Sequence, residues 1–359
     1  MAKKNNAAPA AAAAVSAPAP YVPTADDFRL KNTESIDIDT NYAAQSFWKD
    51  VFIRFRKKKS AVAGLIFVII LTLMAIFGPY MSGYTYYGQD LTAANLAPRI
   101  PGIERLGIFD GSETMHTSSG DTVVNGYDND AHRDDYYWFG TDRYGRDIWT
   151  RTWSGTRVSL IIAVVATVID MVIGLSYGLI SGYFGGKVDI IMQRILEVAN
   201  GIPRLVIVTL LLLVLKPGML TIIVALMLTE WVGMSRIARA EMLKLKEQEF
   251  VQASRTLGAG SMHIIFSEIL PNIIGPVITQ VMFSIPTAIF TEAFLSFVGL
   301  GIPVPQCSLG SLISDGYNSF TTHPYQIIPP IIVMALLMLS FNLIADGLRE
   351  ALDPKMKEM

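Results

Sequence analysis

The stretch 249-EFVQASRTLGAGSMHIIFSEILP-271 is polar and helix-forming, yet it lies between two strongly apolar segments. Four of its residues recur at the three-and-four spacing of one helix face: Glu249, Phe250, Ala253 and Leu257. Gly258 and Gly260 are expected to end this helix, and Pro271 to open the next one. The pattern predicts a short, rigid helix at a membrane surface, of the kind that docks in the groove of a partner protein. An ordinary interfacial helix is the alternative.

The composition indicates an integral membrane protein, because 51% of the 359 residues are hydrophobic, only 17% are charged and the mean hydropathy is +0.40. Several apolar runs approach the length that crosses about 30 Å of hydrocarbon, and this overrides the two soluble domains that length alone suggests. Six runs are predicted to be transmembrane helices: residues 61–81, 158–183, 202–215, 220–237, 273–297 and 327–345. The third is short unless its helix begins before Pro203. The predicted fold class is therefore an all-α polytopic membrane protein with six transmembrane helices.

Basic residues beside the helix ends predict the orientation. Five of them, within residues 54–59, directly precede the first span, so that end is expected in the cytoplasm. Alternation through six spans then places Lys187, Arg194, the loop 238–272 and both termini in the cytoplasm as well. The long segment before the second span becomes an extracellular insertion.

These assignments divide the chain into five parts. They are a disordered, Ala/Pro-rich cytoplasmic tail at 1–50, a first transmembrane helix with its basic flank at 51–81, an extracellular insertion with an interfacial segment at 82–157, a transmembrane core at 158–345 that holds the cytoplasmic loop 238–272, and a cytoplasmic C-terminal tail at 346–359. The N-terminal tail lacks the apolar core of a signal peptide or membrane anchor. Cys307 is the single cysteine and the four histidines are scattered, so neither a disulfide framework nor a metal site is expected.

The predicted insertion ends in the charged segment FGTDRYGRDIWTRTWSGTRVSL, residues 139–160. Trp149 and Trp153 are four residues apart, which predicts a short helix that rests its aromatic face at the lipid headgroups. Three arginines of this segment are expected in solvent or on lipid phosphate, with an external partner or substrate as the alternative: Arg143, Arg146 and Arg151.

Three glycines of the second span follow one another at four-residue steps: Gly174, Gly178 and Gly182. This spacing lines up small residues on one helix face, so a neighbouring helix can approach closely. Helix packing is the favoured interpretation, and a moving gate is the alternative.

Three acidic residues lie within predicted spans, where a charge that faces lipid is costly. Asp170, Glu230 and Glu292 are therefore candidates for the translocation path or its gate, or for pairing inside the protein. For Glu230, an ion pair with Arg236 or Arg239 is an equally good explanation. For Glu292, a hydrogen bond between helices is the alternative.

Five stretches, in a fixed order, carry a family resemblance: GTDRYGRD at 140–147, SGYFGGKVD at 181–189, VQASRTLGAG at 251–260 followed by ILPN, EAFLSFVGLG at 292–301 and FNLIADGLREALDP at 341–354. With them, the chain from its first span to its C-terminus resembles the C-type permease subunit of an oligopeptide or dipeptide ABC importer. The importer motif has the form EAA, three residues, Gly, nine residues and I-x-L-P, and six residues align with it: Gln252, Ala253, Ser254, Gly258, Leu270 and Pro271. Glu268 stands where the motif has isoleucine, because ILP is shifted by one place.

The resemblance implies the type I permease architecture in the bacterial plasma membrane and a non-catalytic subunit. No G-x-x-x-x-G-K-[ST] loop is present; GGKV at 185–188 lacks the earlier glycine and the hydroxyl. ATP and Mg²⁺ are therefore expected on two separate cytoplasmic ATPase subunits, with no cofactor on this chain. Further implied partners are a homologous second permease subunit, an extracellular substrate-binding protein and membrane lipid, but no nucleic acid. The residues expected to couple to the ATPases are Glu249, Phe250, Gln252, Ala253, Ser254, Leu257 and Gly258.

Two other functions stay open. The same family includes permeases for nickel and other small solutes. A proton-coupled secondary transporter would use the intramembrane acids as a relay, but it would need no cytoplasmic docking helix. An ion channel or a membrane-bound enzyme has less support, since neither a selectivity filter nor a nucleophile motif is seen.

Overall fold

The computed structural model describes residues 47–117, 120–128 and 131–352. Helices dominate this part of the chain: α1 (Phe47–Lys57), α2 (Lys59–Phe77), α3 (Ile148–Phe184), α4 (Gly186–Gly201), α5 (Arg204–Val214), α6 (Met219–Thr229), α7 (Trp231–Leu245), α8 (Glu249–Thr256), α9 (Ser261–His263), α10 (Leu270–Asn272), α11 (Ile274–Leu295), α12 (Leu309–Asn318) and α13 (Ile328–Leu352). Two strands, β1 (Ser112–Thr117) and β2 (Gly120–Asn125), form an antiparallel hairpin.

The described helices confirm the polytopic all-α fold. Five stretches are long and apolar enough to cross a membrane, one of them made of α6 and α7 together, and α4 with α5 provides a sixth if this bent pair counts as one span. The predicted third span, 202–215, is wrong in its extent. Its apolar run forms only the 11 residues of α5, and an 81° bend separates α5 from the 16 residues of α4.

Three predicted boundaries also move. α1 begins at Phe47, so residues 47–50 are helical, and the rest of the predicted tail, 1–46, lies outside the described residues. α3 begins at Ile148, ten residues before the predicted second span, because the Asp147 side chain caps it by accepting a hydrogen bond from the Thr150 N–H. α13 continues to Leu352, beyond the predicted end of the core at 345.

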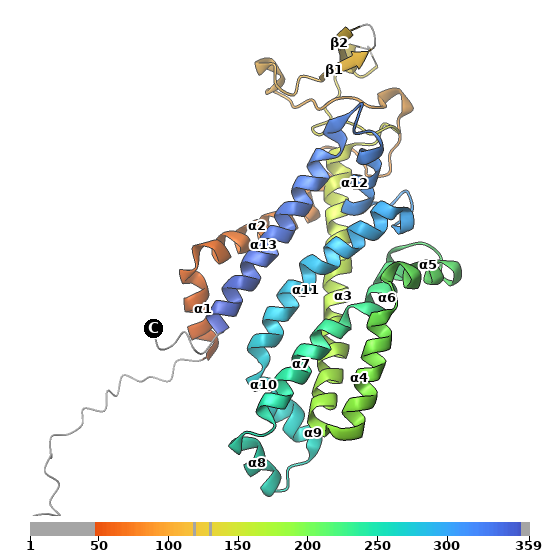
Figure 1. Cartoon of the computed structure of the whole chain (residues 1–359). Coiled ribbons are helices and arrows are strands. Elements are labelled where there is room, and N and C mark those ends of the chain that lie inside the picture. Colours follow the sequence, from red (N-terminus) through yellow and green to blue (C-terminus); the bar gives the residue numbers. More distant parts are fainter. Residues whose placement is uncertain (1–46, 118–119, 129–130, 353–359) are drawn as a thin grey trace, which may run out of the picture. The chain divides into compact units, whose positions relative to one another are not determined.

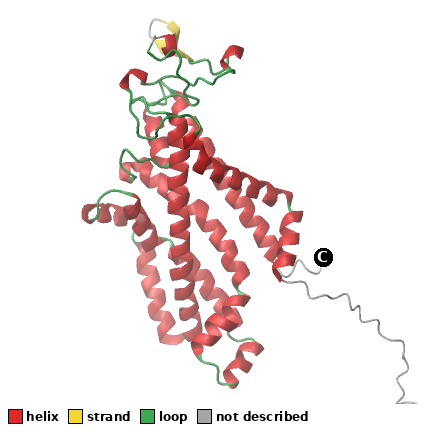
Figure 2. Cartoon of the chain, turned by 180° about the vertical axis from the view of Figure 1, so that it is seen from behind, coloured by secondary structure: helices red, strands yellow, loops and turns green. Residues whose placement is uncertain are grey.

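The long helix α3 passes through the centre of the helical part, with α7, α11, α2 and α13 packed around it (Figures 1 and 2). Its buried residues join two apolar clusters. One contains Ile162 with Ile222 and Ile289, and the other contains Leu179 with Met242. Figure 1 shows the hairpin β1–β2 at one end of the molecule and α8 at the other.

The glycines of α3 lie directly against α7. A Cβ on Gly174 would lie 2.5 Å from the Trp231 carbonyl oxygen, and one on Gly182 would lie 2.8 Å from the Met242 Cβ. A Cβ on Gly178 would clash with the Ser235 carbonyl oxygen and lie 2.7 Å from the Ala238 Cβ. Such distances are shorter than van der Waals contact. The two helices approach each other this closely only because these positions lack a side chain.

We therefore expect Gly178→Ala to lower the midpoint of thermal unfolding of the detergent-purified protein, because the new methyl group must push α7 away. Overpacking of this kind destabilises by about 1–3 kcal/mol. Gly233→Ala is the matched control, since the nearest atom to a Cβ at Gly233 is the Gln280 Nε2 at 3.9 Å. The control should keep or slightly raise the midpoint. Equal midpoints for the two variants would contradict the close contact.

The insertion between α2 and α3 has its own small core of Ala93, Leu96, Tyr127 and Tyr137. The sequence predicted that Trp149 and Trp153 rest on lipid headgroups, but both pack against other side chains of the protein instead. Trp149 contacts Trp138 and Phe139 at ring distances of 4.6 and 4.8 Å, and Trp153 is buried in the main core. The predicted interfacial helix is instead the first three turns of α3.

Candidate functional site

Helix α8 is held to the helical bundle by one side chain and leaves the others exposed. Val251 is its single fully buried residue, and it packs in the cluster that contains Met242, Ile264 and Ile265. Of the seven candidate coupling residues, Ser254 is half-buried. The other six are exposed: Glu249, Phe250, Gln252, Ala253, Leu257 and Gly258. Leu257 is 88% exposed. The apolar face predicted from the spacing thus points away from the protein's own core.

The C-terminal end of α8 is closed by a Schellman motif. The Gly258 N–H donates to the Arg255 carbonyl at 2.9 Å, and the Ala259 N–H donates to the Ser254 carbonyl at 3.1 Å. This motif places Gly258 in the left-handed region, with φ of +85°. Gly260, two residues later, has an ordinary φ of −70° and begins the next helical turn. The two glycines that end the predicted helix therefore have different roles.

Side-chain contacts fix α8 relative to the longer helices. The Arg255 guanidinium lies over the ring of Tyr183 on α3, 5.1 Å from its centre. The Gln252 Nε2 donates to the Lys246 carbonyl at the end of α7. A π-helical turn, Ile264–Ile269, then leads into α10, which contains Pro271, and on to α11. A displacement of α8 would consequently pull on α3, α7 and α11, to which these contacts and the chain connect it.

Glu292 on α11 is completely buried between helices. The Ser159 hydroxyl on α3 donates to its Oε2 at 2.8 Å, and the Ser296 hydroxyl donates to its Oε1 at 2.8 Å. Ser308, which caps α12, lies 3.3 Å from the Ser296 oxygen. The carboxyl group thus connects α3, α11 and the start of α12.

Asp170 and Glu230 both have partners inside the protein. The Ser284 hydroxyl on α11 donates to the Asp170 carboxylate at 2.7 Å. Glu230 pairs with Arg204 at 2.7 Å, so the alternative of an ion pair with Arg236 or Arg239 is wrong, although Glu230 is paired inside the protein. Arg239 instead pairs with Asp189 on α4, at 2.6 Å. Arg204 was missed because it lies 26 residues from Glu230 and because a lone arginine after a proline carries no pairing signal.

Two of the three arginines near the start of α3 are buried, which corrects the expectation that they lie in solvent or on lipid. Arg146 and Arg151 are each 1% exposed. Arg146 pairs with Asp142 at 2.6 Å, and both arginines lie within 3.7 Å of the Asp315 carboxylate on α12. Arg143 stays exposed. These ion pairs therefore connect α12 to the start of α3. Burial raises the pKa of the neighbouring Asp147 carboxyl, although hydrogen bonds from Thr150 oppose this shift.

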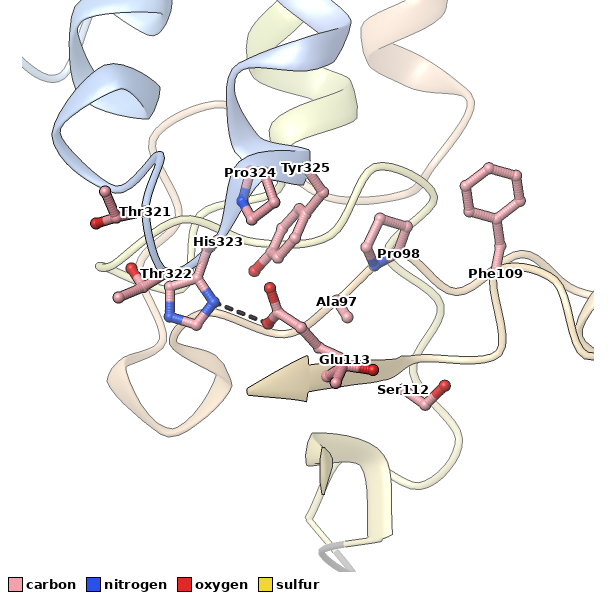
Figure 3. A pocket seen from close by; sticks show the side chains of 11 residues that line it. Ala97, Pro98, Phe109, Ser112, Glu113, Thr321, Thr322, His323, Pro324 and Tyr325 are labelled. Carbon is pink, nitrogen blue, oxygen red and sulfur yellow. Dashed lines mark hydrogen bonds and ion pairs between the residues drawn. The ribbon is translucent and has the colours of Figure 1, made fainter. Parts of the chain in front are cut away.

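A pocket of about 580 Å³ lies between β1 and the segment that precedes α13. Figure 3 shows Glu113 from the strand and His323 from that segment pointing toward each other, with Tyr325 beside them. The His323 Nδ1 lies 2.8 Å from the Glu113 Oε2. This contact ties the hairpin to the last transmembrane helix. Over the described ranges, no three His, Cys, Asp or Glu side chains are arranged to hold a metal ion.

The chain matches known families and proteins over most of its length. Residues 174–358 match the family described as binding-protein-dependent transport system inner membrane component, and residues 46–98 match the N-terminal TM domain of oligopeptide transport permease C. The oligopeptide transport system permease protein OppC of Bacillus subtilis (strain 168) is 42% identical over 313 residues, which cover 87% of this chain and 91% of that protein.

Two dipeptide permeases are similarly close. The dipeptide transport system permease protein DppC of the same organism is 41% identical, with 87% of each chain covered. DppC of Lactococcus lactis subsp. cremoris (strain MG1363) is 40% identical over 339 residues, covering 92% of this chain and 98% of that one. A solved inward-facing structure of the MetNI methionine ABC transporter aligns with a TM-score of 0.49 at 18% identity, over 56% of this chain and 96% of that one.

Relatives that are 40–42% identical cover 87–92% of this chain. The described part of the chain has five candidate membrane spans, or six if the bent pair of α4 and α5 is one span. This chain therefore belongs to the binding-protein-dependent transport system inner membrane components, as a C-type permease of the oligopeptide and dipeptide ABC importers.

Proposed function

We propose that this permease forms one half of a peptide translocation pathway and couples it, through α8, to ATPase subunits on separate chains. A homologous second permease subunit provides the other half. Two ATPases bind at the α8 end, and a substrate-binding protein delivers peptide at the hairpin end. ATP and Mg²⁺ belong to the ATPases in this proposal.

The observation that carries the proposal is the combination of rigidity and exposure in α8. One buried residue, Val251, and a closed C-terminal cap hold the helix, while Phe250 and Leu257 remain exposed on its outer face. A short amphipathic helix with its apolar anchors outward suits insertion into a partner's groove. Because α8 is tied to α3, α7 and α11, rigid-body motion of such a partner would tilt the membrane helices.

The basic residues support an orientation with α8 and both termini in the cytoplasm. Arg54, Lys57 and Lys58 lie at the junction of α1 and α2, beside the first span. The insertion is then extracellular. Arg194, which the sequence placed in a cytoplasmic loop, lies within α4, so it carries no weight in this assignment.

Peptide is the proposed cargo because the relatives above are described as oligopeptide and dipeptide permeases. Their names distinguish these cargoes from nickel or other small solutes. No observation in the described helices favours a proton-coupled mechanism over coupling through α8.

Cysteine labelling tests the orientation and the coupling surface together. In a Cys307→Ser background, we expect Val123→Cys, on the exposed face of β2, to react with a membrane-impermeant thiol reagent on intact cells. Leu257→Cys should react only after permeabilisation. In the purified complex, Leu257→Cys should be protected while the ATPase subunits are bound and become reactive when they are removed.

Val123→Cys is the internal control, since removal of the ATPases should leave its labelling unchanged. Labelling of Leu257→Cys on intact cells would refute the orientation. Labelling of Leu257→Cys that is equally fast with and without bound ATPases would refute α8 as the contact, whatever the orientation.

A further inference from the structure

Helix α4 is unusually polar for part of a membrane span. Three residues at successive three-residue steps are exposed on one side of it: Arg194, Glu197 and Asn200. The Arg194 Nη1 donates to the Glu197 carboxylate at 2.5 Å, and these side chains are 74% and 58% exposed. A charged stripe that faces hydrocarbon is strongly unfavourable. This side of α4 is therefore covered by water or by protein rather than by lipid.

The bend between α4 and α5 leads to the same conclusion independently. Ile202 and Pro203 have extended backbone conformations, and both are exposed. The last carbonyls of α4 lose their intrahelical donors at such a break. The 16 residues of α4 rise about 24 Å from the α8 end, so the break lies deep within the thickness of a bilayer. Irregular backbone at that depth is tolerated only where protein or a water-filled cavity adjoins it.

Arg204 is the first residue of α5, directly after this break, and Glu230 and Thr291 bind its guanidinium. Its Nη1 lies 2.7 Å from the Glu230 Oε1 and donates to the Thr291 hydroxyl at 3.3 Å. The Glu230 side chain is 13% exposed, whereas that of Arg204 is 47% exposed. The acid is thus covered by the base, and the accessible group is a positioned guanidinium.

We infer that the polar stripe of α4 and the bend that follows it line the hydrated pathway, and that Arg204 binds carboxylate or carbonyl oxygens of the peptide in transit, with Glu230 and Thr291 as positioning residues. A guanidinium fixed by a buried carboxylate keeps donors for a second oxygen ligand, and the free C-terminus of a peptide is the strongest such ligand it carries. The inference rests on the proposed function, because it presumes peptide cargo.

Peptide uptake by the complete transporter, with its binding protein and ATPases, tests the assignment. Trialanine and trialanine amide are compared in Arg204→Lys and in the double variant Arg204→Gln/Glu230→Gln, which leaves no buried carboxylate unpaired. We expect the double variant to import trialanine about tenfold more slowly, the loss of one charge-assisted hydrogen bond, and the amide less than twofold more slowly. Arg204→Lys should fall between. The exposed Arg105 of the insertion provides the control, and Arg105→Gln should leave both rates unchanged.

Because the binding protein is the same throughout, a changed preference between the two peptides belongs to the permease. An unchanged preference with normal trialanine uptake would overturn the role of Arg204 and leave the proposed function intact. An equal fall for both peptides, accompanied by loss of the second permease from the purified complex, would show a subunit contact and also overturn it. A wild-type transporter that imports neither peptide would refute the proposed function itself, and with it this role.

A second measurement does not depend on the amide. In the Cys307→Ser background, Ile202→Cys in the membrane-embedded complex should react with a charged, water-soluble thiol reagent, and saturating trialanine with binding protein should slow the reaction. A cysteine at this position that never reacts would show that lipid or a partner chain covers the bend, and would overturn the inference.

Discussion

Gly258→Val is expected to abolish most peptide uptake while the protein remains inserted in the membrane at normal abundance. Gly258 has a φ of +85° in the Schellman motif that closes α8. A β-branched residue is strongly disfavoured there, and strain at such a position amounts to about 1–3 kcal/mol. The side chain meets no neighbouring atom, so the penalty falls on the backbone of the cap alone. The cap would open, and Leu257 would lose its place on the outer face of α8.

The measurements are uptake and substrate-stimulated ATP hydrolysis at equal membrane abundance. Gly260→Val is the matched control, because Gly260 is equally exposed, has no atom near its would-be Cβ and has a φ of −70°. Gly258→Asn should fall between, since asparagine tolerates the left-handed region better than valine. If Gly258→Val and Gly260→Val both transported normally, the proposed role of the α8 cap would be wrong.

The spans were predictable wherever lipid alone decides the composition. The apolar runs at 61–81 and 273–297 correspond to α2 and α11, because a helix that crosses the membrane must be predominantly apolar over most of its length. α4 escaped prediction for the opposite reason. Its exposed Arg194 and Glu197 lower its hydropathy, so the apolar pattern alone gives a third span that is short unless its helix begins before Pro203.

The burial of the charges near the start of α3 could not be predicted because one of their two acidic partners lies far away in the sequence. Arg146 and Arg151 look like solvent-exposed residues in isolation, and their burial depends on Asp142 and on Asp315, 169 residues beyond Arg146. α12 lies between the predicted spans 273–297 and 327–345, and Ser308 and Ser311 form the capping box that begins it. By contrast, the bounds of α8 agree with the prediction, since its start, spacing and glycine stop are all local signals.

The position of an acidic residue within a predicted span indicates that it needs a partner, but it does not identify that partner. Sequence position placed Asp170, Glu230 and Glu292 within the membrane and predicted that each needs a partner. The identity of the partners, Ser284, Arg204 and the serines around Glu292, follows from tertiary packing alone. Depth therefore predicts that a buried acid is bound, but not whether its charge is used.

Glu292→Gln is expected to support near-normal uptake, whereas Glu292→Ala should lose most of it. The described hydrogen bonds of the Glu292 carboxyl come from the Ser159 and Ser296 hydroxyls, and no cation is among these partners. Hydroxyl groups can rotate to donate to the amide oxygen of glutamine or to accept from its NH₂ group, so the connection between α3, α11 and α12 persists. Alanine leaves both hydroxyls buried without this partner, at about 1–3 kcal/mol for each, and adds a cavity.

Uptake at equal membrane abundance and the midpoint of thermal unfolding separate the possible roles of Glu292. A structural connection predicts that both quantities fall together in Glu292→Ala. It also predicts that Ser159→Ala couples to that change in a double-mutant cycle, because Ser159 binds both Glu292 and the Leu309 N–H at the start of α12. A gate or proton relay that uses the charge predicts the reverse: Glu292→Gln would remain stable and fail to transport. Because the serines hold a glutamine as well as a glutamate, a stable but inactive Glu292→Gln would mean that the carboxylate leaves these serines during the transport cycle.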